Sequence, residues 1–304
     1  MKLKNSQLII ETTNLCQAHC VTCPREKFTQ KPAIMTMKLF NKIIDDASNY
    51  GVESLDCCGF GDCFLDTKLF KRFEYVRKKI PDANIFVSTT GFNMDKSKWD
   101  DVLKYVDTLK LSIYGVTEKT YEAFHRGKLK YSISMENIEG LLDYSKYKKK
   151  PYTIGLYMVT EINQHEETAW IRYWEPKLDE IFSWTPHNWV DGRNYRTVYK
   201  DRQVSCGRPF NAPMYIHSDG TVSPCCFDLN KRMIMGDMNT QTIEEIYKGK
   251  PYNKLRKAHE NKDFSRYICS MCDQTNFNPD VLLYKSDSRR EVGQITSNRK
   301  DVRK

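Results

Sequence analysis

Three cysteines stand close together near the start of the chain, in the sequence Cys16-Gln17-Ala18-His19-Cys20-Val21-Thr22-Cys23. Thiolates at these spacings can converge on one iron-sulfur cluster, but they supply only three of its usual four ligands. One iron is then left without a protein ligand. Catalytic metal sites keep such a position free for a small molecule, whereas structural sites are closed. The loop therefore predicts an iron-sulfur site with one open position.

The cysteine loop follows a short apolar segment, which we expect to form a strand that positions it. Leu8, Ile9 and Ile10 form a run typical of a buried strand, and the cysteine loop follows it. The next segment, 37–50, carries apolar residues at helical spacing, with Thr36 as N-cap and Gly51 as stop. The same order then repeats. We expect strands near 52–57, 84–88, 108–113, 152–159 and 180–184, and helices near 67–80, 96–105, 118–124, 135–144 and 166–174.

About six strand-helix units of this kind predict an α/β fold, a partial (β/α)6 barrel that is similar to a TIM barrel. In parallel barrels the chemistry gathers at the C-terminal ends of the strands. The cysteine loop lies at such an end, so its location and its ligand type agree.

Regular alternation stops after Trp184, which indicates a second domain. We place a boundary between Gly192 and Cys206, with a barrel over 1–195 and a smaller domain over 196–280. In the second domain Asp219-Gly220 lies between two short apolar runs and predicts a hairpin, while 242–247 and 252–259 have helical patterns. Residues 281–304 are expected to form a basic, flexible tail.

Composition excludes several classes of protein. Hydrophobic residues make up 40% and charged residues 29% of the 304 residues, which is ordinary for a globular protein. No apolar run suits a membrane span or a signal peptide, so we expect a cytoplasmic protein without a membrane partner. Outside an oxidising compartment, eleven cysteines indicate metal or redox use rather than disulfides. The net charge is +9, of which the segment from Lys285 supplies +4 with seven basic and three acidic residues, so nucleic-acid binding is not expected.

The CxxxCxxC pattern after the first strand of a barrel resembles the radical S-adenosylmethionine (radical SAM) superfamily. In that family three cysteines hold a 4Fe-4S cluster whose open iron binds SAM, and a flavodoxin or ferredoxin-type protein supplies an electron. Reduction cleaves SAM to a 5'-deoxyadenosyl radical, which abstracts a hydrogen atom from the substrate. The resemblance implies that Cys16, Cys20 and Cys23 hold this cluster. A zinc site completed by His19 is the alternative, but zinc gives no reason for polar motifs at later strand ends.

Those polar motifs resemble the SAM-binding motifs of the family. Gly59-Phe60-Gly61-Asp62 is similar to a Gly-Gly-Glu-like motif that contacts the SAM amino group, with Asp in place of Glu and Cys63 where Pro is common. Ser88-Thr89-Thr90-Gly91 resembles the ribose-contacting motif, and Leu111-Ser112-Ile113-Tyr114-Gly115 a further block. Thr22 departs from the aromatic residue of many members. The residues that the resemblance assigns to SAM are Gly61, Asp62, Ser88, Thr90, Ser112 and Arg126.

The second domain resembles a truncated SPASM or twitch extension. Cys206 is followed by thirteen residues, Gly220, four residues and Cys225, and two more thiols come from Cys269 and Cys272. The resemblance implies that these four cysteines close an auxiliary 4Fe-4S cluster, whereas spacing alone leaves open a four-thiolate zinc site. The layout is similar to that of the aminocyclitol dehydrogenase of butirosin biosynthesis and related aminoglycoside-modifying enzymes.

The remaining cysteines and one loop are candidates for contact with substrate. Cys63 and Cys226 lie beside the predicted SAM and auxiliary sites, where a thiol can donate a hydrogen atom to a substrate radical. We expect Cys57 and Cys58 to pack as small hydrophobes. The loop after 180–184 is either structural or supplies substrate contacts on the open face of the barrel, through His187, Asn188, Trp189 and Arg193.

Radical dehydrogenation or epimerisation of a sugar or aminocyclitol is therefore the leading functional hypothesis. Modification of a ribosomal peptide is the alternative, although the chain begins only a few residues before the first strand and leaves no room there for a leader-binding domain. A third hypothesis, an iron-sulfur electron-transfer protein, predicts that the reduced protein releases no 5'-deoxyadenosine from SAM.

Overall fold

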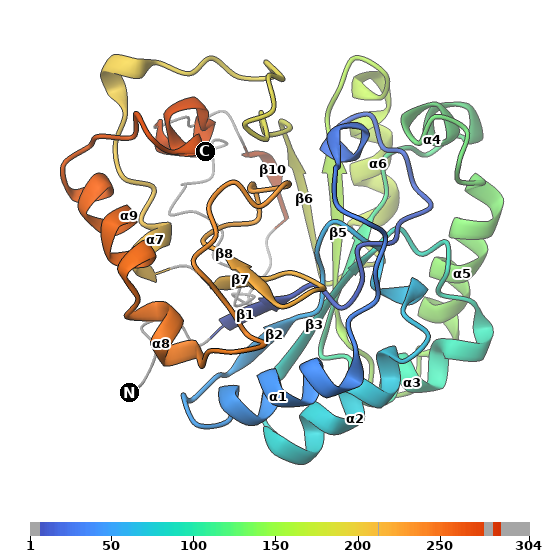
Figure 1. The fold of residues 1–304 in the computed structure, drawn as a ribbon. Helices are drawn as coiled ribbons and strands as arrows, with labels where there is room; N and C mark the ends of the chain where they lie inside the picture. The colour runs from blue at the N-terminus through green and yellow to red at the C-terminus, as the bar shows by residue number, and fades with distance from the viewer. Residues whose placement is uncertain (1–6, 212, 277–281, 287–304) are drawn as a thin grey trace.

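One continuous sheet organises the residues described by the computed structural model, which are 7–211, 213–276 and 282–286 (Figure 1). Its strand order is β10-β6-β5-β4-β3-β2-β1-β7-β8-β9. Strands β1 to β6 pair in parallel, as the alternating pattern predicts. The strands span Gln7–Ile10 (β1), Ser54–Asp56 (β2), Asn84–Thr89 (β3), Thr108–Ser112 (β4), Tyr152–Met158 (β5), Glu180–Trp184 (β6), Met214–Ile216 (β7), Thr221–Ser223 (β8), Gly236–Asp237 (β9) and Leu282–Lys285 (β10).

Six helices cover the outer side of the parallel strands, which confirms the α/β partial barrel (Figure 1). They are Met37–Ala47 (α1), Leu69–Lys79 (α2), Trp99–Tyr105 (α3), Glu118–Phe124 (α4), Tyr131–Tyr144 (α5) and Glu167–Trp174 (α6). In α1 the Thr36 side chain accepts a hydrogen bond from Leu39 N, so the predicted N-cap is confirmed. Helix α5 begins at Tyr131, one turn before the expected start.

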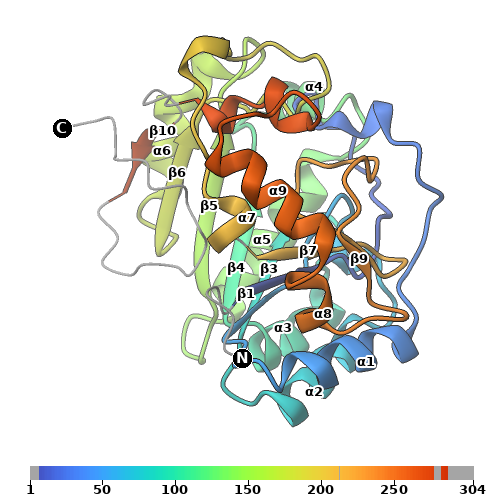
Figure 2. The ribbon, with the colours of Figure 1, turned by 60° about the vertical axis from the view of Figure 1, so that its left-hand side comes forward.

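The C-terminal region extends the same sheet. Strand β7 pairs in parallel with β1, with Leu8 opposite Met214, and it forms the predicted hairpin with β8. Gly220 has φ of 94° in the turn, a conformation that L side chains rarely adopt. Helix Arg208–Asn211 (α7) precedes β7, and helices Ile243–Tyr247 (α8) and Lys250–Glu260 (α9) follow β9, in front of the strands in Figure 2.

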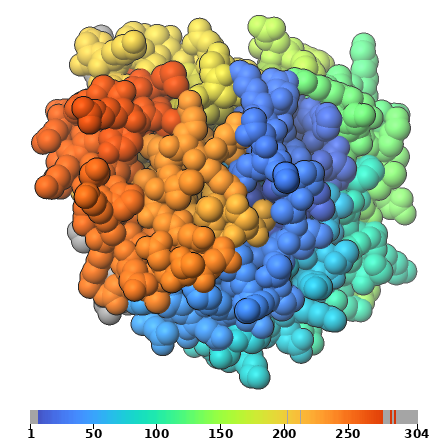
Figure 3. Space-filling view, viewed as in Figure 1, coloured from blue at the N-terminus to red at the C-terminus, as the bar shows by residue number. Residues whose placement is uncertain are grey.

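Residues that are far apart in the sequence meet on one face, where the blue and orange surfaces adjoin in Figure 3. Thr29 N donates to the Asn230 side chain at 3.0 Å, and the same side chain donates to Lys27 O at 2.8 Å. Beneath them the buried Glu11 carboxylate accepts hydrogen bonds from Phe60 N at 2.9 Å and from Tyr215 Oη at 2.7 Å. The barrel and the C-terminal region therefore share a polar core contact as well as a sheet.

Part of the predicted tail is ordered, because β10 pairs antiparallel with β6. The rest of that prediction, residues 287–304, lies outside the described residues. None of the helices in the described ranges has the length and apolar character that crossing a bilayer requires.

Candidate active site

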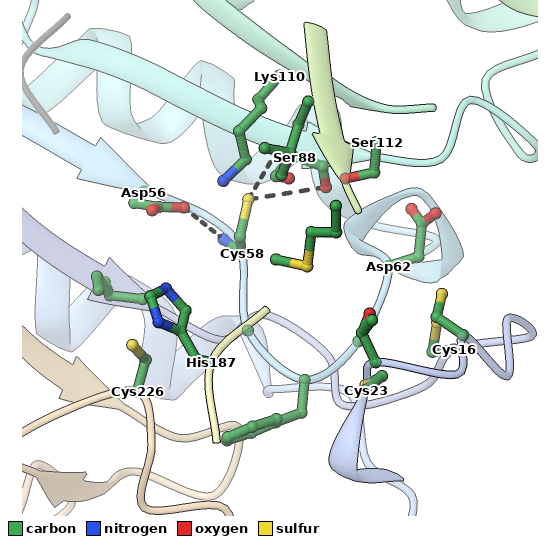
Figure 4. Close-up of a pocket in the computed structure, with 18 of the residues that line it drawn as sticks. Cys16, Cys23, Asp56, Cys58, Asp62, Ser88, Lys110, Ser112, His187 and Cys226 are labelled. Carbon is green, nitrogen blue, oxygen red and sulfur yellow. Dashed lines mark hydrogen bonds between the residues drawn. The ribbon is translucent and has the colours of Figure 1, made fainter. Parts of the chain in front are cut away.

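The three cysteines of the first loop open into one cavity of about 540 Å³ (Figure 4). The loop leaves β1 and turns back on itself, with Cys23 N donating to Cys20 O at 3.0 Å. Burial and the nearby Asp62 carboxylate raise the pKa of the Cys16 thiol to about 12. A thiolate here therefore needs a positive partner, which bound iron supplies.

Arginines outside the cavity hold this loop in shape. Arg193 donates to Val21 O at 2.7 Å, to Cys23 O at 2.8 Å and to Glu26 at 2.9 Å. Arg126 is exposed and pairs with the same Glu26 at 3.0 Å. Neither arginine lines the cavity. Arg193, predicted to contact substrate, and Arg126, predicted to contact SAM, lie instead on the outer side of the cysteine loop.

The Gly59 to Asp62 turn packs against the back of the cysteine loop. A Cβ at Gly61 would lie 2.3 Å from Thr13 O, so only glycine permits this approach. Asp62 N then donates to Leu15 O at 2.8 Å. The Asp62 carboxylate faces the cavity and accepts hydrogen bonds from Thr89 Oγ1 at 3.0 Å and Thr90 Oγ1 at 3.4 Å. Burial raises the pKa of this carboxyl group, although the hydrogen bonds that it accepts act in the opposite direction and lower it.

The remaining residues predicted to contact SAM, Ser88 and Ser112, also line the cavity, as Figure 4 shows. Ser88 is the last residue but one of β3 and Ser112 ends β4, so both lie at the C-terminal edge of the parallel sheet. Five of the six predicted residues thus meet around the cysteine loop, and Arg126 does not. Their contact with SAM stays a prediction.

The cavity residues that were not predicted as site residues include Asp56, Cys58 and Lys110. Cys58 is partly exposed and its Sγ accepts a hydrogen bond from Ser88 N at 2.7 Å. It therefore lines the cavity and does not pack as the small hydrophobe that we expected, whereas Cys57 is only 1% exposed in the core. The sequence did contain a signal for Asp56 and Lys110: both are charged residues on predicted strands of a barrel, where inward-facing side chains are normally apolar.

The loop after β6 contributes an aromatic wall. His187 and Trp189 line the cavity and both rings pack on Phe227, with centroids 5.2 and 5.1 Å away. Asn188 is buried and does not face the cavity, because its side chain accepts from Arg196 N at 2.9 Å. Two of the four predicted substrate residues, His187 and Trp189, are thus in position for that role.

The two predicted hydrogen donors differ in position. Cys63 begins a short 3-10 helix, Cys63–Leu65, that turns away from the cavity, and its side chain is 2% exposed in the hydrophobic core. Cys226 lines the cavity, across from Cys16 in Figure 4. The position of Cys63 near a strand end could not show that its side chain is buried, because the 3-10 helix that begins there sets the direction of the side chain.

The four cysteines of the C-terminal region line a second cavity, and apolar residues that include Leu255 and Ile268 line it with them. These cysteines are Cys206, Cys225, Cys269 and Cys272. Cys225 faces this second cavity while Cys226 faces the first, so adjacent thiols lie on opposite sides of one wall. Among the described residues no three His, Cys, Asp or Glu side chains form the site of a single metal ion. Four thiols around a common space are the donor set of a 4Fe-4S cluster.

Comparison with known proteins gives two family matches. Residues 10–169 match the Radical SAM superfamily, and residues 206–273 match SPASM, an iron-sulfur cluster-binding domain. No curated protein sequence matches the chain.

Several solved structures share the fold. BtrN in complex with AdoMet and 2-DOIA is 16% identical with a TM-score of 0.62, over 93% of this chain and 100% of BtrN. The anSMEcpe complex with AdoMet and the Kp18Cys peptide is 15% identical with a TM-score of 0.66, over 91% and 92% of the two chains. SuiB of Streptococcus suis bound to the precursor peptide SuiA is 14% identical with a TM-score of 0.64, over 83% of this chain and 66% of SuiB.

Proposed function

Because the chain belongs to the radical SAM superfamily, which it matches over residues 10–169, we propose that it removes a hydrogen atom from a carbon of a sugar or aminocyclitol and so dehydrogenates or epimerises it. The family implies a 4Fe-4S cluster and SAM, and the SPASM domain implies further iron-sulfur. When bound, the cluster and SAM supply a 5'-deoxyadenosyl radical as the hydrogen acceptor.

The residues around the first loop suit this pair of cofactors. Cys16, Cys20 and Cys23 would hold the cluster and leave one iron open. Asp62 and Thr90 form a buried acceptor and hydroxyl beside that position, which fits the amino and ribose groups of SAM. Ser88 and Ser112 extend the polar edge toward the rest of the cavity, and the cavity walls exclude water from a reactive carbon radical.

One observation carries the proposal: the cavity lies between the open cysteine loop and the wall that holds Cys225 and Cys226. A substrate radical that loses its hydroxyl proton and one electron becomes a ketone, and Cys225 marks the site behind the wall that would take this electron. A substrate radical that gains the hydrogen atom of the Cys226 S–H becomes the epimer. The resulting thiyl radical needs one electron and one proton, and a flavodoxin or ferredoxin-type protein is the proposed source of that electron.

The test is turnover by the reconstituted, reduced protein in deuterated water with candidate sugars, aminocyclitols and peptides. A ketone without carbon-bound deuterium supports dehydrogenation. An epimer with one carbon-bound deuterium supports epimerisation, since a thiol exchanges its proton with the solvent. If the protein with both clusters forms no 5'-deoxyadenosine with any substrate, the proposal fails.

A peptide substrate is the second candidate. It is favoured by the fold that the chain shares with anSMEcpe bound to a Kp18Cys peptide and with SuiB bound to SuiA. In the same assay, deuterium or a new crosslink in a peptide, with no change in any sugar or aminocyclitol, would replace the first proposal by the second.

A further inference from the structure

A charged floor lies inside the barrel, and it shares Ser88 with the residues that suit SAM. Asp56 comes from β2, Ser88 from β3 and Lys110 from β4, and all three side chains line the cavity in Figure 4. The strand register puts Ser88 directly opposite Lys110 and Asp56 opposite Phe86. Inward positions of parallel barrels are normally filled by branched apolar residues, so charges here need a separate reason.

Neither charge forms a direct ion pair, although the Lys110 ammonium opposes the rise in the pKa of Asp56 that burial causes. Asp56 is 8% exposed, and its Oδ1 accepts one hydrogen bond, from Cys58 N at 3.0 Å. The Lys110 ammonium lies 5.4 Å from the centroid of the Phe86 ring. Among the described residues neither side chain forms an ion pair within 4.0 Å. Charges held out of water without a partner are costly, so a bound molecule that pairs with them gains affinity.

The other cations of the cavity lie close to the cysteines. Arg25 donates to Asn14 O at 2.7 Å and to Phe60 O at 2.6 Å, so it holds the cysteine loop. Arg208 borders both cavities and stands beside the four-cysteine set. Asp56 and Lys110 therefore remain as the charged pair that a substrate meets.

We propose that Asp56 and Lys110 form the specificity subsite, in which Asp56 binds a protonated amino group and Lys110 donates to a neighbouring hydroxyl oxygen of the same ring. This inference rests on the proposed function and narrows it: the substrate is an amino-bearing cyclitol or amino sugar rather than a neutral sugar. Ser88, on the strand between those that carry the two charges, adds a hydroxyl partner for the ring. A site built to pair with an amino group discriminates strongly against the analogue that lacks it, because its own buried charge is then left unpaired.

The test compares two probes of the same ring shape: streptamine, which carries amino groups, and scyllo-inositol, which has hydroxyls in their place. Binding to the reconstituted holoenzyme is measured by calorimetry in the presence of S-adenosylhomocysteine. We expect streptamine to bind at least ten-fold more tightly than scyllo-inositol. Equal affinity for the two probes, or preference for scyllo-inositol, overturns the inference.

Matched variants assign the preference to these residues. Asp56→Asn keeps the acceptor for Cys58 N and removes the charge, so we expect it to lower streptamine affinity ten-fold or more and to leave scyllo-inositol affinity within two-fold. Lys110→Met should weaken both probes. Asp82→Asn, at an exposed position, is the control and should change neither. An Asp56→Asn protein that folds and keeps the wild-type preference contradicts the inference, and if it does not fold the two-probe comparison on the wild type still decides.

Formation of 5'-deoxyadenosine without substrate separates this inference from the proposed function. Wild type and the control Asp82→Asn should both release it on reduction with dithionite. A protein that releases it but shows no preference for streptamine disproves the subsite alone. A fully iron-loaded protein that never releases it disproves the radical function itself.

Discussion

The two cysteine sites are built in opposite ways. Cys16, Cys20 and Cys23 lie on one loop after β1 and open into the large cavity beside Asp62 and Thr90. The other four cysteines come from segments far apart in the sequence, from Cys206 to Cys272, and apolar residues such as Leu255 enclose them. The first site, which is predicted to have a free ligand position, therefore has polar neighbours. The second site, which is predicted to be closed, has apolar ones.

Under the proposed function, this difference would separate chemistry from electron handling. The open site needs room and hydrogen-bond partners for a small molecule, while the closed site needs only a stable cluster near the substrate. The two cavities are separated at Cys225 and Cys226, since these adjacent residues line one cavity each. Variants on either side of that wall should therefore fail in different ways.

The largest effect is expected from the triple variant Cys16→Ala, Cys20→Ala, Cys23→Ala. Iron should fall from about eight to about four per chain, since one 4Fe-4S cluster remains. Release of 5'-deoxyadenosine, measured by chromatography, should fall below detection because SAM loses its iron. A variant that still cleaves SAM would show that the open site lies elsewhere.

Adjacent thiols give the sharpest comparison. Cys225→Ala should lose the iron of the auxiliary site, about four per chain, and keep SAM cleavage. Cys226→Ala should keep all iron and lose at least ten-fold in epimer formation in deuterated water, with Cys63→Ala as the control that changes neither. If Cys226→Ala retains full epimerase activity, it is not the hydrogen donor.

Two arginines on the same glutamate provide a smaller and graded test. The Arg193 side chain is 12% exposed and donates to three acceptors of the cysteine loop, so Arg193→Ala should lower the free energy of unfolding by about 2 kcal/mol or more. Arg126 is 48% exposed, and its alanine variant should cost no more than about 1 kcal/mol. Denaturant unfolding of the two variants checks the order, and equal losses would mean that Arg193 does not anchor the loop.

The smallest effect concerns the reduction potential of the open site. Cys20 Sγ lies 3.2 Å from His125 Nδ1, and burial lowers the pKa of His125 to about 3. The imidazole is therefore neutral above that pH, and its one N–H can donate to the cluster ligand across pH 5 to 9.

His125→Leu removes this donor and should make the potential of the open cluster more negative, whereas His125→Asn can retain a donor and should change it less. Redox titration followed by electron paramagnetic resonance measures both clusters. The auxiliary potential should not move. A potential that varies with pH between 5 and 9 in the wild type would contradict the neutral donor.

Local patterns made most of the fold predictable from the sequence. Helical spacing and the Thr36 cap identified α1, and the alternation of strands and helices identified the parallel sheet. The cysteine loop was predictable for the same reason, because its three predicted ligands lie within one short segment, residues 16–23.

The directions of side chains around the cavity were not predictable. The 3-10 helix after Asp62 carries Cys63 into the core, while Cys58, two residues beyond β2, stays in the cavity. The pairing of β1 with β7 depends on residues that are far apart in the sequence, and no local pattern encodes it. Asp56 and Lys110 were visible as charges on strands, but only the register shows that they share a floor with Ser88.

The pairing of β1 with β7 also bears on how the chain reaches its native state. Strand β1 leaves the ribosome well before one of its two neighbours in the sheet, β7, which is made only after the six parallel strands are complete. Until then β1 presents an unpaired edge, and contacts of such long sequence separation form slowly. Early loading of iron onto the cysteine loop would take place on a half-built sheet, so the order of synthesis, strand pairing and cluster insertion decides how much active protein a cell obtains.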